Sequence, residues 1–118
     1  MGHTSAVVRV SNPTNGEYFD HELLVDTGST YTWIWRRVEG IGLKPFTKWR
    51  FRTIDNRIII REIGEAVFEC LEEKATRIVV FAEEGDAEVL DVDALDGLRL
   101  EVDPVTRQLR KVEALLAL

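Results

Sequence analysis

The segment Asp26-Thr27-Gly28-Ser29-Thr30 contains the residue types best suited to chemistry in this chain. It directly follows the apolar run Leu23-Leu24-Val25, whose composition is typical of a buried strand. A carboxylate at the end of such a strand is costly unless it has a partner or a shifted pKa, so we interpret Asp26 as functional. Gly28 permits a close approach of the backbone that a side chain would prevent. The pattern predicts an acid held in a tight turn supported by hydroxyl groups.

The composition narrows the classes of protein to consider. The chain has 118 residues, which suits one domain over residues 1–118, and its 45% hydrophobic and 31% charged residues are typical of a soluble globular protein. The formal net charge of −6 disfavours nucleic acid as a partner. No apolar run approaches the roughly 20 residues that cross a bilayer, so no membrane partner is expected.

The cysteine and histidine residues offer no metal site. Cys70 is the single cysteine, so an intramolecular disulfide and a cluster of spaced cysteines are both excluded. His3 and His21 lie in turn-rich surroundings without a second ligand at metal spacing. We therefore expect no metal, no cofactor and a cytoplasmic location, with Cys70 as a small buried side chain.

Short β-branched runs separated by turn residues predict a mostly β domain. The segment 66–71 fits a helix or a strand by its local pattern, and we favour a strand because its neighbours are strands. Asp93 is predicted to cap one short helix that ends at Leu98. Asp55-Asn56 is predicted to form a two-residue hairpin turn. The other expected strands are 6–10, 22–25, 31–37, 49–54, 57–63, 77–82, 89–92, and the paired segments 100–102 and 109–112.

Three stretches, 23–30, 50–62 and 85–95 together with 98–106, occur in an order that is similar to a known family. On these stretches the chain resembles the retropepsin-like aspartic proteases, specifically the small single-domain versions found in prokaryotes. The resemblance implies a closed β-barrel protomer that acts as a homodimer. One residue departs from the pattern: after Val89-Leu90 the family usually has glycine, packed closely behind the catalytic loop, and this chain has Asp91. We expect this carboxylate to open the packing or to remain partly solvated.

The resemblance also implies a mechanism and a role for each residue of the loop. The family's chemistry needs two carboxylates that share one proton, and a chain of this length supplies one Asp-Thr-Gly loop. Asp26 of each subunit would therefore lie at a two-fold axis and be catalytic. Thr27 would hydrogen-bond across the dimer, Gly28 would form the turn and face substrate, and Ser29 would hydrogen-bond the outer carboxylate oxygen. The alternative for Asp26 is a structural Asx-turn that closes the strand.

The second stretch lies where the family carries the flap that covers its substrate. The resemblance assigns the flap to Ile54, Asp55, Asn56, Arg57 and Ile58, which would close over an extended peptide. The alternative is an exposed hairpin without a ligand. Arg50, Arg52, Arg57 and Arg61 alternate along the hairpin and are expected to form a solvated face rather than a nucleic-acid patch. Trp33, Trp35 and Trp49 favour core or interface packing, with a substrate subsite as the second interpretation.

The sequence leaves three hypotheses about function. The first is an aspartic endopeptidase that acts on peptide or protein substrates as a homodimer. The second is a non-proteolytic dimerisation or peptide-binding module with the same fold. The third interprets Asp-Thr-Gly-Ser-Thr as the phosphate-binding loop of an actin-like ATPase, although such enzymes need two lobes and a second phosphate loop that the sequence lacks.

Overall fold

The computed structural model describes residues 4–113, and the prediction of a mostly β chain with one short α-helix is confirmed. In chain order the elements are β1 (Ser5–Ser11), β2 (Tyr18–Val25), β3 (Thr32–Trp35), the 3-10 helix η1 (Arg36–Ile41), β4 (Thr47–Arg52), β5 (Ile58–Cys70), β6 (Glu73–Ala82), β7 (Val89–Leu90), α1 (Val92–Leu98), β8 (Leu100–Val102) and β9 (Leu109–Lys111).

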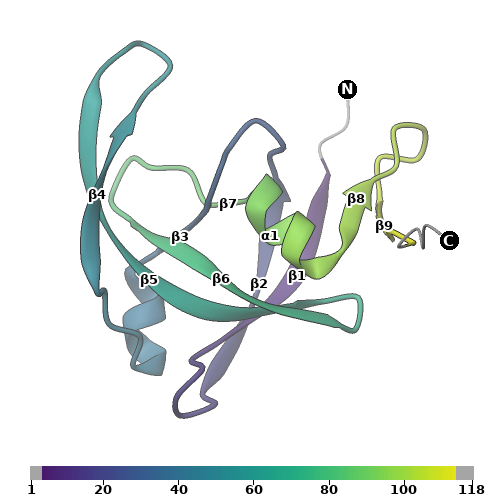
Figure 1. Ribbon diagram of the computed structural model, residues 1–118, viewed down its shortest axis with the longest axis horizontal. Helices are drawn as coiled ribbons and strands as arrows, with labels where there is room; N and C mark the ends of the chain where they lie inside the picture. The colour runs from purple at the N-terminus through teal and green to yellow at the C-terminus, as the bar shows by residue number, and fades with distance from the viewer. Residues whose placement is uncertain (1–3, 114–118) are drawn as a thin grey trace, which may run out of the picture.

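Seven strands form one sheet in the order β1-β2-β7-β3-β6-β5-β4. The order also returns on itself, because residues 9–11 of β1 pair with residues 67–69 of β5. Strands β8 and β9 form a separate antiparallel pair. Figure 1 shows the long β4–β5 hairpin at one side of the molecule and the β8–β9 hairpin at the other, with α1 next to β7 and β8. Strand β7 therefore lies between β2 and β3, so the segment after β2, which begins at Asp26, lies next to the segment after β7, which begins at Asp91.

The core consists of apolar side chains from the strands of the large sheet, packed together with the buried face of α1. Phe68 of β5 and Phe81 of β6 are completely buried, as are Leu23 of β2 and Ile34 of β3. Helix α1 contributes Ala94, Leu95 and Leu98 to the same cluster. Each large side chain of this kind contributes about 1.5–3 kcal/mol by burial. Cys70 is buried as predicted, and burial raises the pKa of its thiol.

Several element boundaries differ from the prediction. The segment 66–71 is a strand as favoured, since β5 continues to Cys70. The strand predicted over 31–37 ends at Trp35, where the unpredicted helix η1 begins. The strand predicted over 89–92 ends at Leu90, and Asp91 rather than Asp93 caps α1. The N-cap prediction was wrong because the carboxylate of Asp91 reaches the first N–H groups of the helix, two residues earlier than the pattern indicated.

The predicted two-residue turn at Asp55-Asn56 is wrong, because five residues, 53–57, connect β4 to β5. The Thr53 N–H donates to the Arg57 carbonyl at 2.8 Å, and the Asn56 N–H donates to the Thr53 carbonyl at 2.9 Å. The Thr53 hydroxyl also bonds to the carboxylate of Asp55. Asn56 adopts a positive φ of 67°, as expected for the residue type. These bonds close the loop between Thr53 and Arg57, and β4 ends at Arg52 rather than at Ile54.

Within residues 4–113, no helix combines the length and the apolar composition needed to cross a membrane.

Gly64 lies where β5 passes close to a backbone carbonyl and an aromatic ring. A Cβ at this position would lie 3.1 Å from the Lys44 carbonyl oxygen and 3.2 Å from Cε1 of Phe81. We expect Gly64→Ala to lower the free energy of unfolding by about 1–3 kcal/mol, because backbone and a buried ring cannot move away cheaply. Urea unfolding followed by tryptophan fluorescence measures the change.

Gly40→Ala is the matched control, because Gly40 is exposed and a Cβ there would meet nothing within 4 Å. We expect it to leave the unfolding midpoint nearly unchanged. Equal midpoints for the two variants would contradict the close packing at Gly64.

Candidate functional site

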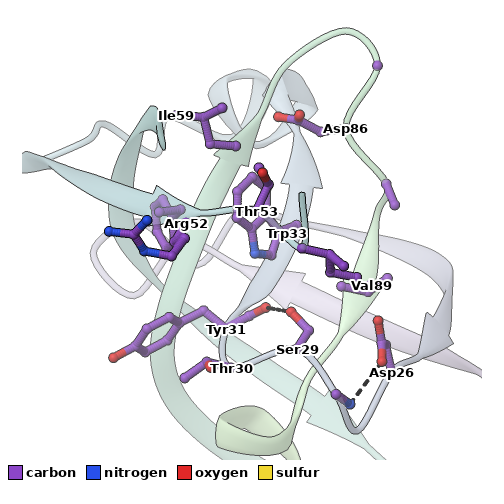
Figure 2. Close-up of a pocket in the computed structure, with 15 residues that line it drawn as sticks. Asp26, Ser29, Thr30, Tyr31, Trp33, Arg52, Thr53, Ile59, Asp86 and Val89 are labelled. Carbon is purple, nitrogen blue, oxygen red and sulfur yellow. Dashed lines mark hydrogen bonds between the residues drawn. The ribbon is translucent and has the colours of Figure 1, made fainter. Parts of the chain in front are cut away.

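A single cleft brings together the segment after β2 and the β4–β5 hairpin (Figure 2). Its volume is about 490 Å³. The loop after β2 and strand β3 contribute Asp26, Gly28, Ser29, Thr30, Tyr31 and Trp33; the hairpin contributes Phe51, Arg52, Thr53, Ile54 and Ile59; the segment before and within β7 contributes Gly85, Asp86, Ala87 and Val89. Parts of all three stretches that resemble the retropepsin-like proteases therefore meet at one cavity.

Asp26 is held in a tight turn, as the sequence predicted. Its N–H donates to the Leu90 carbonyl at 2.9 Å, which fixes the turn to β7. The Gly28 N–H donates to Oδ1 of Asp26 at 2.9 Å, and Figure 2 shows this bond at the edge of the cleft. This is the local hydrogen bond of an Asx-turn, so the structural alternative describes the turn correctly. It leaves the carboxylate facing solvent, where it remains available for chemistry.

Two expectations about the loop were wrong for a single chain. Asp26 is exposed rather than buried, because the preceding strand is only partly covered and Leu24 is 49% exposed. The Ser29 hydroxyl donates to the Tyr31 carbonyl at 3.1 Å rather than to the Asp26 carboxylate. Thr27 is exposed, and its predicted bond across a dimer stays a prediction. The exposure of Asp26 and the partner of the Ser29 hydroxyl both depend on the path of the loop in the folded chain, which the sequence pattern alone does not determine.

The predicted flap residues divide between the cleft and solvent. Ile54 lines the cleft and is otherwise fully exposed, whereas Asp55, Asn56, Arg57 and Ile58 are exposed and do not line it. Their places in the lining are taken by the flanking residues Phe51, Arg52, Thr53 and Ile59. The hairpin residues that line the cleft therefore lie nearer its base than the predicted flap residues, with Ile54 common to both sets, and the role of the hairpin as a flap stays a prediction.

Polar contacts within the hairpin tip hold its shape. Arg57 Nε lies 2.9 Å from a carboxylate oxygen of Asp55, and Arg52 donates to Oδ1 of Asn56 at 2.6 Å. The Thr53 hydroxyl and then the Arg57 guanidinium lower the pKa of Asp55. These five side chains are hydrogen-bonded to one another, and Ile54 is the exposed apolar residue among them.

Aromatic side chains form one wall of the cleft. Trp33 meets Phe51 edge to face, with ring centroids 5.0 Å apart, and Tyr31 lies 5.2 Å from Trp49. Trp33, Phe51 and Tyr31 also line the cavity, so the packed cluster borders the cleft, and the interpretation of Trp33 as part of a substrate subsite stays a prediction. Trp35 is separate and 45% exposed. Tyr31 and Phe51 were not predicted as cleft residues, although Phe51 alternates with the cations of β4 and so had to face the opposite side of the strand.

Arg61 joins the hairpin to the opposite wall. Its guanidinium binds Asp86 through two bonds, of 2.6 and 2.9 Å, and both side chains are largely buried. The hydrogen bonds from the Arg61 guanidinium lower the pKa of Asp86, and the same carboxylate accepts from the Glu83 N–H at 2.8 Å. The prediction that Arg61 belongs to a solvated face was therefore wrong, because its partner lies 25 residues further along the chain, beyond the reach of a local pattern.

Asp91 is completely buried, so the expectation of opened packing or partial solvation was wrong. Its carboxylate accepts from the Thr32 hydroxyl at 2.5 Å and from the N–H groups of Asp93 and Ala94 at 3.1 and 3.2 Å. Desolvation raises the pKa of Asp91 from 3.8 to about 6, against the opposing effect of these three donors. The Thr32 hydroxyl and the two N–H groups of α1 therefore satisfy the buried carboxylate.

The raised pKa of Asp91 predicts an unusual dependence of stability on pH. The folded chain binds this proton more tightly than the unfolded chain, so the stabilisation is fully present below pH 3.8 and is lost as the pH rises through about 6. We expect the free energy of unfolding to fall by about 2–3 kcal/mol over that interval through this group. Urea unfolding at pH 4, 5, 6 and 7 measures it.

The control for this prediction is Asp91→Asn, which carries no titrating proton at this position. Carboxyls whose pKa is lowered, Asp20, Asp55, Asp86 and Asp103, lose their stabilisation at still lower pH and cancel in the difference between the two proteins. If the difference in the free energy of unfolding between the wild-type protein and Asp91→Asn stays constant from pH 4 to 7, the raised pKa of Asp91 is contradicted.

No cluster of three or more potential metal ligands occurs within the described part of the chain. A scan against models of known protein families found no match for the chain, and a search of curated proteins found none either. The case for any function therefore depends on the residues of the cleft.

Proposed function

We propose that the chain is the protomer of a retropepsin-like aspartic endopeptidase, active as a homodimer in which Asp26 of two subunits forms the catalytic pair. The observation that carries the proposal is the cleft itself, which the Asp-Thr-Gly loop and the β4–β5 hairpin border together. The return pairing of β1 with β5 supports the closed barrel of that family. Cys70, a lone thiol, fits a cytoplasmic protein.

The need for a second subunit follows from the carboxylates around the cleft. Among the described residues that line it, the acids are Asp26 and Asp86. Asp86 is bound through both oxygens to Arg61, so it cannot share a proton with Asp26. Asp91 is completely buried behind the loop and cannot reach substrate. The second carboxylate must therefore come from another copy, and the exposure of Asp26 leaves it accessible to one.

The proposed chemistry is general acid–base activation of water. Two carboxylates in contact cannot both ionise, so the pair holds one proton. The ionised member takes a proton from water, and the protonated member donates to the oxygen of the scissile carbonyl. The pair titrates as a unit, and neither role belongs to one subunit. The aromatic wall and Ile54 would hold apolar side chains of an extended peptide while the hairpin limits access of water.

The test is hydrolysis of a denatured protein from pH 4 to 7, with sedimentation run at the same concentrations. We expect internal cleavage where the protein sediments as a dimer. Absence of cleavage at concentrations where the dimer is present would overturn the proposal. Saturable peptide binding without cleavage would instead favour the non-proteolytic peptide-binding module.

A further inference from the structure

The segment 90–92 lies directly behind the loop that carries Asp26 and is bonded to both ends of it. The Leu90 carbonyl accepts from the Asp26 N–H at 2.9 Å. The Val92 N–H lies 3.4 Å from the Ser29 carbonyl that it faces. Between these two main-chain contacts, the buried carboxylate of Asp91 accepts from the hydroxyl of Thr32, the first residue of β3. Two contacts to the loop and one to the start of β3 therefore hold the segment 90–92 in place behind the loop.

The same carboxylate also fixes that segment to a rigid base. It caps α1 through the N–H groups of Asp93 and Ala94, and α1 buries Ala94, Leu95 and Leu98 in the core. The N–H of Asp91 also faces the Thr32 hydroxyl, at 3.4 Å, so the two residues are joined in both directions. A single buried side chain thus joins the helix, the start of β3 and, through β3, the end of the Asp26 loop.

We propose that Asp91 is a positioning residue of the active site, which holds the Asp26 loop in place through the hydroxyl of Thr32. This inference rests on the proposed function, because it assigns Asp91 a role in that site. Asp91 does not touch substrate, since it is completely buried. Its contribution is the placement of Asp26 relative to the second subunit. Any displacement of the loop occurs in both subunits and is thereby doubled across the two-fold axis, and a misplacement of about 1 Å costs about 10²-fold in rate.

The variant that isolates the contact is Thr32→Val, which removes the hydroxyl and retains the β-branched shape. We expect kcat to fall about 10- to 100-fold while KM stays within about 2-fold, because the altered placement affects the transition state more than binding. Thr32→Ser restores a hydroxyl and should restore most of kcat. Thr76→Val, at an exposed threonine of β6, is the matched control and should retain full activity.

Hydrogen exchange provides a readout that does not depend on hydrolysis. In Thr32→Val we expect the N–H groups of Asp26 and Val92 to exchange about 10-fold faster or more, with the N–H groups of Val79 and Phe81 in β6 unchanged. General destabilisation would instead accelerate exchange in β6 as well, and would overturn the positioning role. Unchanged exchange at Asp26 and Val92, or full kcat in Thr32→Val, would overturn it too. If the wild-type chain hydrolyses nothing, the proposed function fails, and the exchange rates still decide whether Asp91 holds the loop.

Discussion

Asp26→Asn is expected to lower peptide hydrolysis by at least ~10³-fold, because an amide can neither accept the proton of water nor share one with a second acid. In the proposed homodimer the substitution removes both members of the pair at once. The fold should be unaffected, since Asp26 is exposed and an asparagine oxygen can still accept from the Gly28 N–H. Initial rates of peptide cleavage, with circular dichroism to verify folding, measure the effect.

The matched control for Asp26→Asn is Asp96→Asn, which makes the same change at an exposed carboxylate of α1 outside the cleft. Asp96→Asn should keep the wild-type rate. Comparable rates for Asp26→Asn and the wild-type protein would mean that the cleavage comes from another group or from a contaminating protease, and the assignment of Asp26 would be abandoned.

Gly28→Ala is expected to lower the rate of hydrolysis by about 10²-fold with little change in stability. A Cβ at Gly28 would lie 3.2 Å from Oδ1 of Asp26, the same oxygen that the Gly28 N–H binds at 2.9 Å. The carboxylate must shift by a few tenths of an ångström, and small displacements are costly where two groups share a proton. Stability should change little, because Gly28 is exposed.

Gly40→Ala serves again as the control for an added methyl group, since Gly40 is exposed and lies outside the cleft. Kinetic constants and urea midpoints should be measured for both variants. A Gly28→Ala protein with the wild-type rate would show that the position of this oxygen does not matter, whereas equal losses in rate and stability would indicate local unfolding instead.

Much of the fold was predictable from local pattern. β-branched runs and the residues between them located nearly all of the strands, because alternation and turn residues are properties of a few neighbouring positions. The ambiguous segment 66–71 became a strand because it pairs with both β6 and β1, a tertiary effect that overrides its local preference for helix. The length of the hairpin loop was missed because bonds between Thr53 and Arg57, which flank the expected turn dipeptide, close the loop.

The site was predictable where one residue type in one turn determines the geometry. The bond from the Gly28 N–H to Asp26 joins residues two apart, and the motif indicated it. Contacts between residues far apart in sequence were not predicted. Arg61 binds Asp86, 25 residues away, and Thr32 hydrogen-bonds to Asp91, 59 residues away. Asp91 is the clearest case, because nothing adjacent to it in sequence signals that a hydroxyl of β3 will satisfy a buried acid.

The most direct test of the account mixes wild-type and Asp26→Asn subunits under conditions that allow subunit exchange. If the active unit contains Asp26 from two chains, activity follows the square of the wild-type fraction, so an equal mixture keeps about one quarter of the activity of the same total amount of wild-type protein. An equal mixture that keeps about one half would mean that each chain acts alone. That result would contradict the shared catalytic pair.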